Sequence, residues 1–144
     1  MMNEAITFSV IGRPAAQGSK RYLGNGVMVE SSRHVHPWRA DVKMSAIGAT
    51  PLHWDKEAPF SLTITFLFVR PKGHYGSKGL KPSAPAAPSG RVGDLDKLLR
   101  STLDAMTGIV FADDCQVVTL YAAKRYALPG EQPGALITAI PLAI

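Results

Sequence analysis

Residues 60–69, FSLTITFLFV, form the clearest predicted strand in this chain of 144 residues. Apolar side chains alternate there with small polar ones, and a period of two is that of a strand with one buried face. The apolar positions are Phe60, Leu62, Ile64 and Phe66. A helix is predicted next, at 94–106, and a further strand at 116–126. This order predicts a sheet with helices packed on it.

Other segments extend this core. Residues 4–12 and 135–143 are also predicted strands, and the triplet GNG at 24–26 is typical of a hairpin turn. A helix is predicted around 36–49, from Trp38, Val42 and Ala46 at helical spacing. We therefore expect an α/β (α+β) fold, with a mixed β-sheet and two main helices packed on it, in one domain spanning 1–144.

A long segment, 71–93, separates the first predicted strand from the second helix. Its four prolines and five glycines are expected to rule out regular structure. It contains no acid, and a loop of this length in a small domain is usually functional or disordered. The sequence thus predicts a flexible basic loop.

Composition and charge narrow the class of protein. The chain carries a net charge of +5, and its acid-free tracts 5–29 and 58–93 favour nucleic acid as the partner. No apolar run is long enough for a bilayer, and the first residues lack the basic region of a signal peptide, so we expect neither a membrane span nor a signal peptide. The single cysteine, Cys115, excludes an internal disulfide framework and suits a reducing cytoplasm.

Acidic residues gather in a chain that is otherwise basic. Asp94 and Asp96 stand at the start of the second helix, and Asp113-Asp114 follow it. On a regular helix two residues at i and i+2 diverge by about 200°, so the first pair converges only if Asp94 precedes the helix. Simpler structural roles remain open. Asp94 would cap the helix, Asp96 would interact with the positive end of the helix dipole, and Asp113-Asp114 would form a solvated turn. Asp104 is expected to pair with Arg100.

The apolar stripe of this helix is predicted to face the core. It consists of Leu95, Leu98, Leu99, Thr102, Leu103 and Met106. Spacing alone does not say whether the chain brings Asp114 back to the level of Asp94. If it does, three carboxylates meet beside a basic loop, and such hard oxygen ligands suit Mg²⁺ or Mn²⁺ with a substrate phosphate.

The acidic motifs resemble those of RusA-type Holliday-junction resolvases. The resemblance rests on GDLDKL at 93–98, LDAM at 103–106 and FADDCQV at 111–117, and it is looser upstream of residue 90. It implies a homodimeric, Mg²⁺-dependent endonuclease, with Mn²⁺ as a possible substitute, that cuts four-way DNA junctions symmetrically in recombination and repair. It also implies a location in the cytoplasm of a bacterial or phage-infected cell.

The resemblance assigns roles to individual residues. The essential aspartates of the family fall on Asp94, Asp96 and Asp114, and its functional lysine falls on Arg100. Arginine keeps the positive charge but does not readily release a proton, so we expect charge stabilisation from Arg100 and no acid–base work. Contacts to the DNA backbone are expected from Lys20, Arg21, Lys72, Lys78 and Arg91.

Two other classes of function stay open from sequence. One is a non-catalytic binder of branched or single-stranded DNA, whose aspartates serve only as caps and turns. In such a binder, the DNA bases would stack on aromatic side chains such as Tyr22, Trp38 and Tyr75, although Trp38 also suits the core. The other is a metal-dependent hydrolase of small phosphate esters. A zinc site at His34 and His36 lacks an apparent third ligand.

Overall fold

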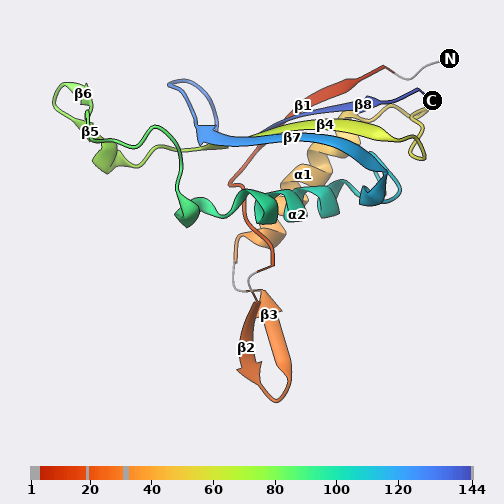
Figure 1. Ribbon diagram of the computed structural model, residues 1–144, viewed down its shortest axis with the longest axis horizontal. Coiled ribbons are helices and arrows are strands. Elements are labelled where there is room, and N and C mark those ends of the chain that lie inside the picture. Colours follow the sequence, from red (N-terminus) through yellow and green to blue (C-terminus); the bar gives the residue numbers. More distant parts are fainter. Residues whose placement is uncertain (1–3, 19, 31–32, 144) are drawn as a thin grey trace.

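The computed structural model describes residues 4–18, 20–30 and 33–143; for 20–22 and 27–30 it describes the backbone alone. The main strands are β1 (Ile6–Ile11), β4 (Phe60–Phe68), β7 (Val117–Tyr126) and β8 (Gly134–Pro141), and the helices are α1 (Val35–Ala49) and α2 (Leu95–Met106). The strands form one sheet in the order β1-β8-β4-β7, and both helices lie on one face of it (Figure 1). The predicted single-domain α+β class, with a mixed sheet and two helices, is confirmed.

Strand β4 is an inner strand of the sheet and lies between β8 and β7. It pairs antiparallel with β8 and parallel with β7, from Phe60 opposite Val117 to Phe68 opposite Tyr126. A parallel pair needs a crossover, and here α2 supplies it. The alternating side chains predicted to be buried are at most 1% exposed. The sheet therefore leaves β7 as a free edge, with α2 running beneath it in the opposite direction (Figure 1).

Helix α2 buries a face that differs from the predicted stripe. Leu98, Thr102 and Met106 are buried as expected, but Ser101 is buried as well. Its hydroxyl donates to the carbonyl of Ala15 at 2.6 Å, which ties the chain leaving β1 to the helix. The rest of the predicted stripe is only partly buried, namely Leu95, Leu99 and Leu103.

Helix α1 covers the remainder of the sheet face and packs against α2. Trp38 is fully buried, and its indole N–H donates to the hydroxyl of Thr102 at 3.1 Å. This hydrogen bond satisfies the polar end of a large aromatic side chain within the core. The idea that Trp38 stacks on DNA bases is therefore wrong. It is a core residue.

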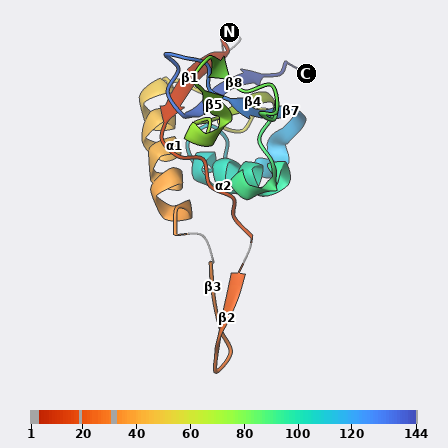
Figure 2. The same ribbon diagram turned by 90° about the vertical axis from the view of Figure 1, so that its left-hand side faces the viewer.

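A hairpin projects from the body of the molecule. Its strands are β2 (Lys20–Gly24) and β3 (Val27–Glu30), and Figures 1 and 2 show it standing away from the sheet and helices. The predicted GNG turn is confirmed, with positive φ at all three residues, including 52° at Asn25. The hairpin leaves the body next to α2, where the backbone N–H of Gln17 donates to the carbonyl of Lys97 at 3.0 Å.

The segment 71–93 is more regular than its composition predicts. It contains η1 (Lys72–His74), the two-residue strands β5 (Tyr75–Gly76) and β6 (Gly79–Leu80), and η2 (Gly90–Val92). Arg70 anchors its base, because its guanidinium lies 4.1 Å from the ring centroid of Tyr126 and donates to the carbonyl of Pro85 at 2.6 Å. The expectation of no regular structure here is wrong: glycine-rich turns close a small hairpin.

Candidate active site

The backbone places Asp94 at the entrance of α2. Gly93 precedes it with φ of 108°, and a Cβ built there would lie 2.8 Å from the Cβ of Ala16. This position therefore requires glycine. The ammonium group of Lys124 donates to the carbonyl of Gly93 at 3.0 Å, which fixes the turn to the end of β7.

Asp94 occupies the N-cap position without acting as a cap. Its backbone is extended, and its side chain makes no capping hydrogen bond. Its carboxylate lies 3.6 Å from the ammonium group of Lys97, in an exposed pair that contributes little to stability. The structural explanation of this aspartate from helix capping is therefore wrong.

Asp96 lies in the first turn of α2 and is exposed. Because Asp94 precedes the helix, the condition under which the two carboxylates converge is met. Both carboxylates remain open to solvent at the positive end of the helix dipole.

Arg100 lies one turn further along α2. A Cβ built on Gly18 would come within 2.7 Å of a guanidinium nitrogen of Arg100, so this side chain rests against the chain that enters the hairpin. The predicted ion pair between Arg100 and Asp104 is not among those found in the described part of the chain. Asp104 instead accepts a hydrogen bond from the side-chain amide of Gln17 at 2.7 Å.

The two aspartates of the second acidic pair, Asp113 and Asp114, differ in role: Asp113 is used in a local cap, and the carboxylate of Asp114 is available for other contacts. Asp113 caps η3 (Asp114–Gln116): its carboxylate accepts from the backbone N–H of Cys115 at 2.9 Å, while Gln116 accepts from the N–H of Asp113 at 2.8 Å. The hydrogen bonds to Cys115 lower the pKa of Asp113. Burial, then the hydrogen bond and charge of Asp113, and finally the charge of Asp104, raise the pKa of Asp114.

One chain does not bring the three predicted aspartates together. Within the described ranges, no group of three His, Cys, Asp or Glu side chains is placed to hold a metal ion. Asp94 precedes α2, whereas Asp114 follows it and is close enough to Asp104, in the last turn, to be influenced by its charge. Because α2 has 12 residues, its two ends are about 18 Å apart. Among the residues that the structure describes, the pair of His34 and His36 likewise gains no third ligand.

Three of the predicted DNA-contacting residues have side chains that the structure describes, and all three are exposed. Arg91 lies in η2, three residues before Asp94, and it is exposed. Lys72 and Lys78 are also exposed, in the segment anchored by Arg70. Lys20 and Arg21 belong to β2, and their side chains lie outside the described parts of the structure.

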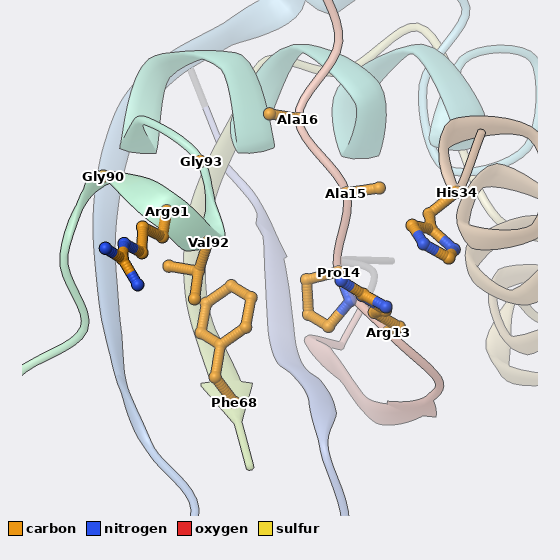
Figure 3. Close-up of a pocket in the computed structure, with 10 residues that line it drawn as sticks. All are labelled: Arg13, Pro14, Ala15, Ala16, His34, Phe68, Gly90, Arg91, Val92 and Gly93. Carbon is orange, nitrogen blue, oxygen red and sulfur yellow. The ribbon is translucent and has the colours of Figure 1, made fainter. Parts of the chain in front are cut away.

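Sequence reasoning missed two basic residues beside Asp94. Lys124 holds the turn at Gly93, as described above, and also approaches the carbonyl of Ser89 at 3.3 Å. Arg13 lines a pocket of about 250 Å³ that ends at Gly93 (Figure 3). The only signal for Arg13 was its place in an acid-free tract, which does not separate it from other surface cations.

The comparison with known families settles the class of protein. The family model described as Endodeoxyribonuclease RusA matches residues 12–138. The chain belongs to this family. No curated protein gives a significant match. RusA endodeoxyribonucleases resolve Holliday junctions, bind branched DNA and depend in general on a metal.

Membership of the RusA family decides between the classes that the sequence left open. The chain is an endodeoxyribonuclease of the Holliday-junction resolvase class, so the expectations of an enzyme and of branched DNA as partner are confirmed. The alternatives of a non-catalytic DNA binder and a small phosphate-ester hydrolase are not supported. None of the helices in the described ranges has the length and apolar character needed to cross a membrane.

Proposed function

We propose that this endonuclease resolves Holliday junctions in DNA recombination and repair by Mg²⁺-assisted hydrolysis, with Asp94, Asp96 and Asp114 as the metal ligands. One observation carries the assignment: Asp94 occupies the N-cap position of α2, but its side chain makes no capping hydrogen bond. A carboxylate held in place by its backbone and left open to solvent is available for another task.

The donor set matches the proposed metal. Mg²⁺ takes oxygen ligands, usually one or two carboxylates together with waters and substrate phosphate, and Mn²⁺ accepts the same donors. The raised pKa of Asp114 reflects burial and crowded negative charge, which a cation beside it relieves. When bound, the ion polarises the scissile phosphate and lowers the pKa of an attacking water.

The remaining roles belong to cations of this chain. Arg100 lies on the same helix as Asp96 and stabilises the negative charge that develops on the phosphate. Lys124 is a positioning residue, since it holds the carbonyl before Asp94. Contacts to the DNA backbone come from the dispersed exposed cations and from the projecting hairpin, namely Lys20, Arg21, Lys72, Lys78 and Arg91.

A second copy of the chain completes the site. Strand β7 is an edge strand whose long free side exposes apolar residues: Val118 is 61%, Leu120 39% and Tyr121 65% exposed. Unpaired edges of this kind are templates for pairing with another strand. A two-fold axis through β7 joins the two sheets by antiparallel β7–β7 pairing.

Charge and geometry both favour this pairing. The acidic pair Asp113-Asp114 precedes β7, and the basic pair Lys124-Arg125 ends it, so antiparallel strands place acid beside base at both ends. Lys124 also marks the level of Asp94, through its bond to Gly93. The axis therefore brings Asp114 of one copy toward Asp94 and Asp96 of the other. Two equivalent sites result, one for each strand to be cut.

A substitution of Asp96 tests the proposed metal site. Asp96→Asn keeps the size of the side chain but removes its charge, so it is expected to abolish Mg²⁺-dependent cutting of a synthetic four-way junction while binding persists. Cleavage is followed with labelled strands and binding by gel shift in Ca²⁺. Glu4→Gln, at an exposed carboxylate outside the proposed site, is the matched control. Unaltered cutting by Asp96→Asn refutes its role as a ligand.

The location follows from the substrate. We place the enzyme where recombining DNA is found, in the cytoplasm of a bacterial or phage-infected cell. The single exposed thiol, Cys115, suits a reducing compartment.

A further inference from the structure

A pocket adjoins the aspartates at the entrance of α2. It lies between the chain that leaves β1, the end of β4 and the short helix η2, and it stops at Gly93, next to Asp94 (Figure 3). Its volume is about 250 Å³. A neighbouring hollow of about 330 Å³ continues it toward Val69 and Pro133. The pocket is thus a depression that opens beside the proposed metal ligands.

The floor of the pocket is apolar and aromatic. Phe68 is 6% exposed and contributes its ring, with Val92 and Pro14 on either side in Figure 3. Both hollows share these three residues. A flat aromatic and proline surface of this kind accommodates a planar ring by stacking and van der Waals contact.

The rim of the pocket is cationic. Arg13 and Arg91 are exposed and reach it from different segments of the chain, and neither forms an ion pair within the described ranges. His34 closes another side. Burial lowers the pKa of His34, and the charges of Arg13 and Arg33 lower it further. Such a rim attracts an anion, and guanidinium groups bind phosphate through two parallel hydrogen bonds.

The size of the pocket selects among anionic ligands with a planar part. Pockets for drug-sized ligands measure about 300–1,000 Å³, so the space next to Asp94 lies just below this range. It suits one base better than a base pair, and it exceeds the needs of a lone phosphate. Enzymes that act on DNA admit single nucleotides to such pockets, and removal from the stack costs least where a base is already unpaired.

We propose that this pocket receives one unstacked nucleotide at the branch point of the DNA, with its base on Phe68, Pro14 and Val92 and its phosphates against Arg13 and Arg91. The inference rests on the nuclease function proposed above, because the bound nucleotide would lie one residue from Asp94. It adds a reason for branch selectivity: a continuous duplex offers no base to the pocket, whereas a branch point does.

Fluorescence of 2-aminopurine tests this occupancy directly. The base is placed at each nucleotide flanking the branch of a four-way junction, and emission is measured at saturating protein in Ca²⁺. Emission rises when this base loses its stacking neighbours. We expect a several-fold rise at one branch position with the native chain and none with a matched continuous duplex. Val92→Trp fills the pocket and is expected to remove the rise, whereas Ile47→Trp, at an exposed site on α1, leaves it intact.

A second variant covers the case in which Val92→Trp does not fold. Arg13→Gln removes one exposed rim charge and is expected to reduce the emission rise, whereas Lys43→Gln removes an exposed charge elsewhere on the surface and leaves the rise unchanged at saturation. Thermal unfolding confirms that each variant is folded. No rise at any branch position, or the same rise with a filled pocket, overturns the inference.

Cutting of the same junctions in Mg²⁺ separates this inference from the proposed function. Normal Mg²⁺-dependent cutting without an emission rise refutes the nucleotide pocket and leaves the nuclease mechanism standing. A branch-specific rise that Val92→Trp abolishes, in a protein that does not cut, supports the pocket and refutes the mechanism.

Discussion

Mixing two inactive variants tests whether the active site is shared between copies. Asp96→Asn and Asp114→Asn each damage both sites of their own homodimer. In a mixed dimer with shared sites, one site carries both substitutions and the other carries none. About half of randomly paired dimers are mixed, and each has one of two sites intact, so about a quarter of the native sites return. The expected product is a junction nicked on one strand.

The distance between Asp94 and Asp114 within one chain makes this test decisive. Two ligands of one Mg²⁺ lie within about 4 Å of each other, and a pair of ions about 4 Å apart extends this reach to about 8 Å. The two ends of α2 are about 18 Å apart, so Asp94 and Asp114 of one chain are too far apart to share an ion or an ion pair. A site within one chain would give no rescue by mixing.

The assay uses junctions with opposite strands labelled in different colours. Differently tagged variants are co-purified to prove that subunits exchange, and single-strand cutting is read on denaturing gels. Asp94→Asn mixed with Asp96→Asn is the matched control, because both changes lie in the same half-site and every mixed dimer keeps two damaged sites. Absence of rescue for the Asp96 and Asp114 mixture, despite proven exchange, would refute the shared site, as would equal rescue in the control.

Three further outcomes follow from contacts described above. Gly93→Ala places a side chain at a residue with positive φ, against the methyl group of Ala16. Junction cutting is therefore expected to fall by about tenfold or more, while the far-ultraviolet circular dichroism is unchanged. Native activity of this variant would contradict the requirement for glycine. Trp38→Phe leaves the hydroxyl of Thr102 without its indole donor and opens a gap, at a cost of about 1–3 kcal/mol measured by urea unfolding; a change below 0.5 kcal/mol would contradict it. Glu131 has a pKa lowered to about 2 by the hydrogen bond from Arg125, below the ordinary 4.5, so its stabilising effect is present above pH 4.5 and is lost as the pH falls toward 2. The stability difference between native protein and Glu131→Gln should therefore shrink steeply over this interval and be lost below pH 2 in acid titrations, and a difference that stays constant from pH 4.5 to pH 2 would contradict the assignment.

Local sequence patterns predicted the elements but not their placement. The alternation from Phe60 was sufficient for β4, because burial of one face imposes a period of two. The buried face of α2 was predicted less well, since Ser101 is buried by its hydrogen bond to Ala15, a partner distant in sequence. Strand order also escaped prediction, because pairing depends on contacts between distant segments.

The same distinction applies to the candidate site. The spacing left open whether Asp94 belongs to the helix predicted at 94–106 or precedes it, and the structure places it before α2, with an extended backbone. The position of Asp114 followed from topology: a crossover between parallel strands begins at the carboxyl end of one strand and ends at the amino end of the next, so Asp114 lies at the opposite end of the strands from Asp94. A sequence motif records which residues act together, and it does not record whether they belong to the same molecule.

The length of α2 has a further consequence for the proposed homodimer. In the proposed homodimer, each shared site would combine the beginning of one α2 with the end of the other, so the length of the helix would set the separation between the two incisions. Inserting four residues would lengthen it by about 6 Å, and nucleotides along a strand are about 3.4 Å apart, so the two cuts would move by roughly two nucleotides relative to each other. The helix would thus act as a ruler for the symmetry of resolution.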